Sequence, residues 1–275
     1  MKHLYIFSTL LFLNFGVWAQ NTSEIKGNRN LKKISIDLYE TFQTVEIDDE
    51  LEVTLRQGKE NRYTLETDEN LIGVIKFTVQ NNILKIYTSQ TITRSKKIDI
   101  ELTVTDLQKI VLKNDAEIRS RNRLETEMLA IYAYNSSKAD IEVETTKFTA
   151  LMQHNATGKF EVRAETTELV MNGRTDMNAD IKTDALMVTT QENAELKLDG
   201  SADLGEFTLM DASKIDAEHM KVSEISVSAT KNTDAYVHAT KNLKITAEGD
   251  SKIYVYGNPD LTVETFADKA RIIKK

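Results

Sequence analysis

A repeat with a period near 19 residues runs through residues 106–275, and it constrains the fold more than any other feature. Hydrophobic residues taken as anchors of the repeat are separated by 23, 19, 17, 19, 19, 22, 16 and 19 positions. A second series, of apolar-x-apolar triplets, recurs every 17 to 21 residues. The anchors are Ile118, Ile141, Phe160, Met177, Leu196, Ile215, Val237, Ile253 and Ile272, and the triplets begin at Leu129, Phe148, Leu169, Leu186, Phe207, Ile225, Leu243 and Leu261. Self-similarity at such a short period is typical of solenoids, in which each repeat forms one coil.

Apolar and polar residues alternate within each repeat, as in 129–133 (LAIYA) and 139–143 (ADIEV). Alternation places apolar side chains on one face of a strand, and a single repeat has no partner for that face. Nine coils stacked in parallel, about 4.8 Å apart, extend over roughly 43 Å, and each coil has room for three short strands and three corners. The sequence therefore predicts an all-β fold: a parallel β-solenoid of about nine ~19-residue coils with an N-terminal β cap. A right-handed coil is the expected hand, although the sequence alone leaves the handedness open.

An antiparallel meander is the main alternative fold, and the turn residues disfavour it. Two-residue hairpin turns favour Asn-Gly or Asp-Gly wherever the chain reverses direction, and only Asp199-Gly200 matches this preference. With 10 Gly and 1 Pro in the chain, corners are expected at Asn and Asp residues, which tolerate left-handed backbone. The expected corner residues are Asn114-Asp115, Asn135, Asn155 and Asn193, and the small residues expected to stack beside them are Ala116, Ala139, Gly158, Thr175, Ala194, Ser213, Ala235, Ser251 and Ala270.

The N-terminal third divides into three segments. Residues 1–19 have a basic start, an apolar run and a small-x-small site, which predicts a cleaved secretory signal peptide. Residues 20–33 are polar without periodicity and are interpreted as a flexible leader. Residues 34–105 alternate as strands do and are expected to cap the 106–275 solenoid as part of one domain. With no Cys to carry a lipid and no span after cleavage, the mature chain is expected in the periplasm, on the outer surface or secreted.

Turn signals inside the expected cap, and charges at the opposite end, predict local structure. Asp68 is expected to cap one short helical turn, and Asn81-Asn82 is expected to take positive φ in a hairpin. At the C-terminal end, the exposed sheet edge is expected to be protected from pairing with other strands by Pro259 and the cationic Arg271, Lys274 and Lys275.

The segments 42–45 (FQTV), 53–58 (VTLRQG), 68–71 (DENL), 79–86 (VQNNILKI) and 255–259 (VYGNP) occur in a characteristic order. This order resembles the putative auto-transporter adhesin, head GIN domain family of bacterial envelope proteins. The resemblance implies a β-solenoid in the envelope, with no established enzyme activity and no catalytic residues to transfer.

Metal and enzyme chemistry find little support in the sequence. His154, His219 and His238 fall at different positions of their repeats, so no zinc site is expected, and no cofactor is predicted. With the repeat aligned on its hydrophobic anchors, Glu117 neighbours Asp140 and Asp176 neighbours Glu195, so each pair offers oxygens to a hard cation such as Ca²⁺. Lysines interleave in this column, so mixed charge that relieves cross-strand repulsion explains it better. Asp176 and Glu195 remain the weaker alternative as a metal site, of the kind a calcium-assisted polysaccharide lyase uses.

Four outward side chains near the C-terminus form the candidate ligand-binding site. Alternation that points Val237 and Val255 inward points Tyr236, His238, Tyr254 and Tyr256 outward on adjoining coils. Exposed tyrosines are also common on β surfaces for reasons of strand propensity alone.

Taken together, these features predict a non-catalytic envelope or secreted protein with a binding, adhesive or structural role. A polysaccharide lyase and a periplasmic partner of an envelope signalling protein are the two alternatives. The expected partner is a glycan or an envelope protein. A formal net charge of -8 without a basic stripe disfavours nucleic acid, and the sequence leaves the oligomeric state open.

Overall fold

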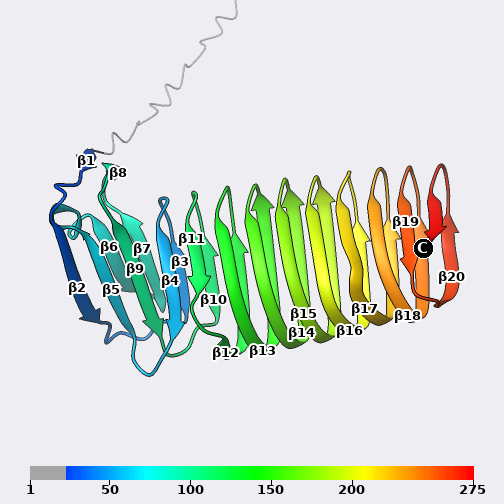
Figure 1. Ribbon diagram of the computed structural model, residues 1–275, viewed down its shortest axis with the longest axis horizontal. Helices are drawn as coiled ribbons and strands as arrows, with labels where there is room; N and C mark the ends of the chain where they lie inside the picture. Colours follow the sequence, from blue (N-terminus) through cyan, green and yellow to red (C-terminus); the bar gives the residue numbers. More distant parts are fainter. Residues whose placement is uncertain (1–22) are drawn as a thin grey trace, which may run out of the picture.

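The computed structural model describes residues 23–275, so the expected signal peptide lies outside the described residues. Strands make up nearly all of the secondary structure, and the coils stack into one elongated body (Figure 1). The predicted all-β parallel solenoid of about nine coils is confirmed. Its strands are β10 (Lys109–Leu112), β11 (Glu117–Ser120), β12 (Leu124–Ala133), β13 (Lys138–His154), β14 (Thr157–Gly173), β15 (Asp176–Glu192), β16 (Glu195–Leu209), β17 (Lys214–Ala229), β18 (Asp234–Ala247), β19 (Lys252–Tyr256), β20 (Asp260–Phe266) and β21 (Arg271–Lys274).

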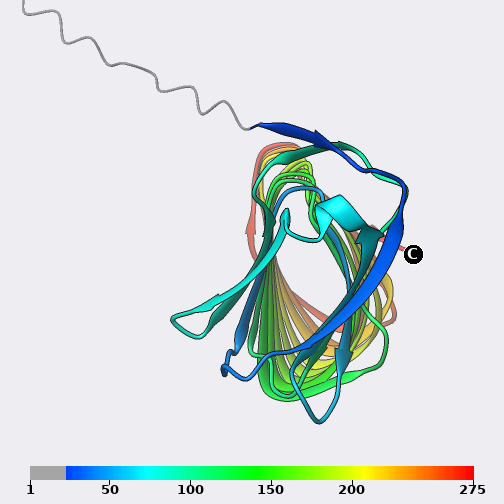
Figure 2. The ribbon, with the colours of Figure 1, turned by 90° about the vertical axis from the view of Figure 1, so that its left-hand side faces the viewer.

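Each coil has two sides, where the sequence suggested three strands and three corners. One end of the coil is a tight turn, and at the other end the strand continues around a broad bend, which gives the flattened ring of Figure 2. In β13 the inward residues Val143 and Thr145 are followed by two exposed residues before the buried Phe148. This slip of one residue in the alternation turns the strand, because the side chains that face the core then come from the opposite sheet.

The pairing register is more regular than the anchor series predicted. Ile118 pairs with Ala139, Ala139 with Gly158, and Gly158 with Met177. The anchors Ile141, Phe160 and Val237, and the triplet residues Leu169 and Phe207, are therefore two residues out of register. The prediction was wrong there because inward residues two apart on one strand look alike in the sequence. The true column is Ile118, Ala139, Gly158, Met177, Leu196, Ile215, Ala235, Ile253 and Ile272.

The tight turns use left-handed residues that are mostly not glycine. Asn114, Asp115 and Asn135 have positive φ as predicted, whereas at the next two predicted corners the left-handed residue is the preceding one, His154 or Glu192. Beside the turns, a column of small buried residues is linked coil to coil by backbone hydrogen bonds. The column is Ala116, Ser137, Ala156, Thr175, Ala194, Ser213, Thr233, Ser251 and Ala270, so three predicted members, Ala139, Gly158 and Ala235, lie two residues beyond it.

The Asp199-Gly200 pair does not form a hairpin, because it lies inside β16. Gly200 has φ of +117° and pairs with Ile181, and a Cβ on it would approach the Ile181 carbonyl oxygen to 2.1 Å. Only glycine therefore fits this close approach of neighbouring coils.

The N-terminal region combines one further coil with a true cap. Two of its strands stack in parallel between later segments: β3 lies between β7 and β10, and β4 lies between β9 and β11. The stack therefore starts before residue 106, in an order that differs from the chain order. The elements are β1 (Glu24–Lys26), β2 (Leu31–Asp37), β3 (Thr44–Ile47), β4 (Glu52–Gln57), β5 (Arg62–Asp68), the 3-10 turn η1 (Glu69–Leu71), β6 (Ile75–Gln80), β7 (Ile83–Thr88), β8 (Thr91–Arg94) and β9 (Ile98–Val104).

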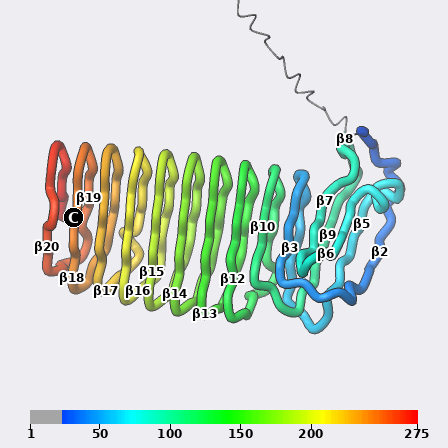
Figure 3. The backbone as a smooth tube through the Cα atoms, turned by 180° about the vertical axis from the view of Figure 1, so that it is seen from behind, coloured from blue at the N-terminus to red at the C-terminus, as the bar shows by residue number. Residues whose placement is uncertain are grey.

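Antiparallel pairing closes this end, with β5 between β9 and β2 (Figure 3). Tyr63 and Phe77 stack with ring centroids 3.7 Å apart on the cap. Much of the expected leader is ordered, since β1 pairs with β8 and β2 begins at Leu31; these long-range partners are not visible in a local polar sequence. Asn81 and Asn82 do take positive φ, of 52° and 64°, in the β6–β7 hairpin.

Asp68 does not cap η1 as predicted. Its buried side chain makes no capping bond, and its Oδ2 accepts the backbone N–H of Lys96, 2.7 Å away. The carboxylate thus ties the β8–β9 connection to β5. Among residues 23–275, no helix is long and apolar enough to cross a membrane.

Candidate functional site

The four predicted ligand-binding residues lie side by side near the C-terminal end of the array. β18 and β19 pair so that Tyr236 faces Tyr254 and His238 faces Tyr256. The residues between them are buried, and all four outward side chains are half-buried on a flat parallel sheet. We call this group, Tyr236, His238, Tyr254 and Tyr256, the tyrosine patch.

The rings of the tyrosine patch are not the flat platform that a row of tyrosines suggests. Tyr236 and Tyr254 stack on each other, with centroids 4.3 Å apart and planes 9° apart. Lys214 Nζ lies 5.5 Å from the Tyr236 ring centroid, and Lys275 Nζ lies 5.3 Å from that of Tyr254. Ring faces are therefore engaged by one another and by the two cations, an arrangement that holds the rings in place. Ring edges and the acceptor lone pairs of the hydroxyl groups are the parts left to meet a ligand.

A bulge in β17 adds Glu218 to the patch, and sequence reasoning missed it. The register between β17 and β18 shifts between Ala217 and Lys221, which lets Glu218 protrude. Its backbone oxygen lies 3.0 Å from His238 Nδ1. A hydrogen bond to the Glu218 carboxylate, aided by burial, raises the pKa of Tyr256 to about 12. Burial, and then the charge of Tyr254, also raise the pKa of Tyr236. Both phenols are therefore neutral at ordinary pH, and the Tyr256 O–H donates to Glu218.

Of the two acidic pairs expected from the sequence as possible metal ligands, the structure brings only one together. Asp176 and Glu195 do pair on β15 and β16, as predicted. Glu117 pairs with Lys138, not with Asp140, because the assumed register was two residues out; the Glu117 and Lys138 side chains lie 3.9 Å apart. Across the described part of the chain, no group of three or more His, Cys, Asp or Glu side chains is arranged to hold a metal ion.

The correct register reveals an acidic column that the sequence analysis missed. Glu142, Glu161, Asp180 and Asp199 pair in succession on four neighbouring strands. They line a shallow groove of about 370 Å³. Arg123 binds the first two carboxylates, so part of the repulsion between stacked acids is relieved.

A larger groove, of about 660 Å³, crosses the opposite sheet over β15, β16, β17, β18 and β20. Its lining includes Met187 and Leu204, exposed by 40% and 54%, and the charged residues Glu206, Glu224 and Lys244. The sequence marked Leu186, Ile225 and Leu243 of this groove only as members of the repeat. It gave no sign of a binding site there, because isolated exposed apolar residues in one strand are ordinary.

Fold and surface together define a class: a stacked β repeat protein that presents long, flat sheets along its coils. The sequence pattern of the family "Putative auto-transporter adhesin, head GIN domain" matches residues 41–161 and 149–259. The two matches cover most of the chain, which therefore belongs to this family. Comparison with curated proteins gives no match.

Solved structures of similar proteins share the fold. A putative adhesin from Parabacteroides merdae is 18% identical, with a TM-score of 0.72 over 92% of this chain and 99% of its own. A putative adhesin from Parabacteroides distasonis is 17% identical, with a TM-score of 0.67 over 92% and 100%. A putative lipid binding protein from the same organism is 17% identical, with a TM-score of 0.62 over 92% and 97%. At these identities the likeness shows the fold alone.

Proposed function

We propose that this protein is a non-catalytic, adhesin-type binding protein of the Gram-negative cell envelope, exported to the periplasm or beyond it. The observation that carries the proposal is the tyrosine patch, where Tyr236 and Tyr254 stack and His238 and Tyr256 continue the same outward surface on β18 and β19. The family and the adhesin names of two similar structures support the binding role.

The geometry favours a ligand with many hydroxyl groups, such as a glycan. Neutral phenol groups and the His238 ring offer hydrogen bonds at fixed spacing, because each side chain stands on a strand paired to its neighbour. Ring faces are already engaged, so each contact is weak and little rotamer entropy is lost on binding. Single-site affinity should be modest, and adhesion should depend on several copies acting together.

The test is a glycan array probed with the mature chain and with a triple variant, Tyr236→Ser, Tyr254→Ser and Tyr256→Ser. We expect the triple variant to lose binding while its unfolding free energy stays within about 2 kcal/mol of the parent, since these are surface changes. Tyr132→Ser is the matched control, because Tyr132 is a tyrosine on the same kind of sheet with Lys109 Nζ 4.3 Å from its ring centroid. Equal binding by the triple variant and the parent would contradict the proposal.

A further inference from the structure

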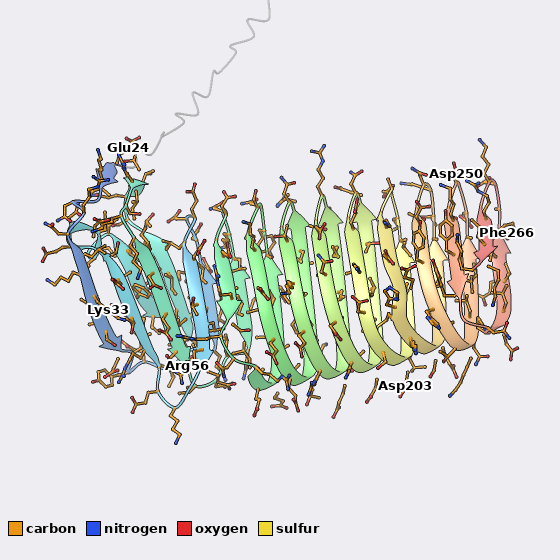
Figure 4. All side chains as sticks on the ribbon, viewed as in Figure 1. Glu24, Lys33, Arg56, Asp203, Asp250 and Phe266 are labelled. Carbon is orange, nitrogen blue, oxygen red and sulfur yellow. The ribbon has the colours of Figure 1, made fainter. Side chains whose placement is uncertain are left out.

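The C-terminal end of the array is a coil whose core has no cover among the described residues. β20 and β21 pair with β18 and β19 on one side only. Leu261, Val263 and Phe266 are exposed by 49%, 44% and 54%, and Phe266 is labelled at this end in Figure 4. Their register partners one coil earlier are Leu243, Ile245 and Ala247, all buried. These are core positions that lack the next layer. We call β20 and β21 together the open end.

We propose that the open end is covered by the open end of a second copy of this chain, related by a two-fold axis that runs parallel to the strands. Such an axis places β20 of one copy against β21 of the other. β20 and β21 run in opposite directions around their shared turn, so the new pair is antiparallel and forms ordinary sheet hydrogen bonds. An isologous contact of this kind also closes the assembly at two copies.

Charge complementarity selects this axis. β20 carries Asp260 and Glu264, whereas β21 and the residue after it carry Arg271, Lys274 and Lys275. These cations, expected from the sequence to oppose edge pairing, do so only against other cations and favour pairing with an acidic strand. The proposed axis sets the acidic strand of each copy against the basic strand of the other. A two-fold axis perpendicular to the sheets would set β21 against itself and bring Arg271 opposite the second copy's Lys274, and like charges directly opposite destabilise a sheet.

The N-terminal end of a second copy is a less favourable partner for the open end. There β2 and β5 lie across the stack in antiparallel pairing, and β2 presents Lys32 and Lys33 on exposed positions. The three cationic residues at the open end would meet these lysines in a head-to-tail stack. Head-to-head contact avoids this repulsion and buries the three exposed apolar side chains of both copies.

The size of the open end determines how strongly two copies are expected to associate. Seven residues at ~3.3 Å each make β20 roughly 23 Å long. Two sheets ~10 Å apart, with their outward side chains, make the end roughly 20 Å wide, so two copies bury on the order of 900 Å² in total. Stable interfaces usually exceed about 1,000 Å², so the dimer should be weak and concentration-dependent, with a Kd in the micromolar range or above.

The first test is sedimentation velocity of the chain from Gln20 onward, at concentrations from about 1 μM to about 500 μM. We expect a monomer at the low end of this series and a dimer at the high end. The double variant Leu261→Lys and Val263→Lys should remain monomeric throughout. Leu204→Lys is the matched control, since Leu204 is exposed by 54% but lies in the middle of the array, and it should dimerise as the parent does. A parent that stays monomeric, or a double variant that dimerises equally, would overturn the proposal.

The second test fixes the geometry. With the two-fold axis parallel to the strands, the turn at 267–270 meets its own copy, so a cysteine placed there should bridge the two chains. The chain has no Cys, which makes single-cysteine variants clean. Oxidised Lys269→Cys should give a disulfide-linked dimer, whereas Asn232→Cys, at the same place in a turn two coils earlier, should not. Equal cross-linking of both variants, or none at Lys269→Cys, would rule out this arrangement.

Discussion

The two ends of the array differ in whether a further layer of chain covers the hydrophobic core. At the N-terminal end, β2, β5 and β9 form an antiparallel layer, and its inward side chains Leu65 on β5 and Ile100 on β9 are exposed by 0% and 1%. At the open end, Leu261 and Phe266 occupy equivalent inward positions and are about half exposed. Identical alternation therefore gives a core only where a further layer of chain is present.

This difference shows where the stability of a solenoid resides. Each coil contacts only its neighbours, so a side chain contributes in proportion to the layers on either side of it. The array can consequently tolerate at its open end a change that it cannot tolerate in the middle or under the cap.

The largest effect is expected from a charge placed in the middle of the stack. Leu196 is 2% exposed, so Leu196→Asp loses the roughly 1.5–3 kcal/mol of burying a leucine and adds an unpaired buried charge. The variant should fail to fold, as measured by circular dichroism and proteolysis. Leu261→Asp, the same change at the open end, should fold with near-parental stability. Equal damage from both changes would mean that the open end is as constrained as the middle.

A smaller effect is expected when the cap and the open end are compared by the same truncation. Leu65→Ala leaves a cavity on the buried face of the cap strand β5 and should lower the unfolding free energy by about 2–5 kcal/mol. Leu261→Ala should cost under about 1 kcal/mol in a dilute, monomeric sample, because solvent already reaches that side chain. Chemical denaturation of both variants gives the comparison. A small loss at Leu65 would show that the cap is loosely attached.

The smallest effect concerns pH. Burial tends to raise the pKa of Glu46, but ion pairs with Lys113 and Lys85, at 2.9 Å and 3.3 Å, outweigh it and hold the pKa below its ordinary value of 4.5. The folded-state pKa is the lower one, so the stabilisation is present above pH 4.5 and is lost as pH falls through the folded-state value. Glu46→Gln should therefore destabilise at about pH 6 and much less at about pH 3.

The control for this measurement lies at the open end. Glu264 pairs with Lys244 at 2.7 Å, but both side chains are about half exposed, so solvent screens the pair. Glu264→Gln should change the unfolding free energy little at either pH. A pH-independent loss in Glu46→Gln would mean that its ion pairs do not contribute.

The sequence by itself determined the kind of fold and much of its local structure. Alternation at a period near 19 required stacked strands, and the Asn81-Asn82 hairpin and the left-handed Asn135 followed from side-chain chemistry. The four residues of the tyrosine patch were also predictable, because alternation and a nearly constant repeat length bring them together.

Only the tertiary structure decided the register, the order of the coils and the finer chemistry of the site. Inward residues two apart are equivalent by pattern, so the choice between Ile141 and Ala139 as partner of Ile118 depends on packing across the core. Insertion of β3 and β4 between later strands depends on contacts far apart in the chain. Glu218 reaches the patch through a bulge, and the tyrosine faces turn toward each other. Alternation predicts which face of the sheet a side chain lies on, whereas the packing of whole coils against one another determines which side chains are its neighbours.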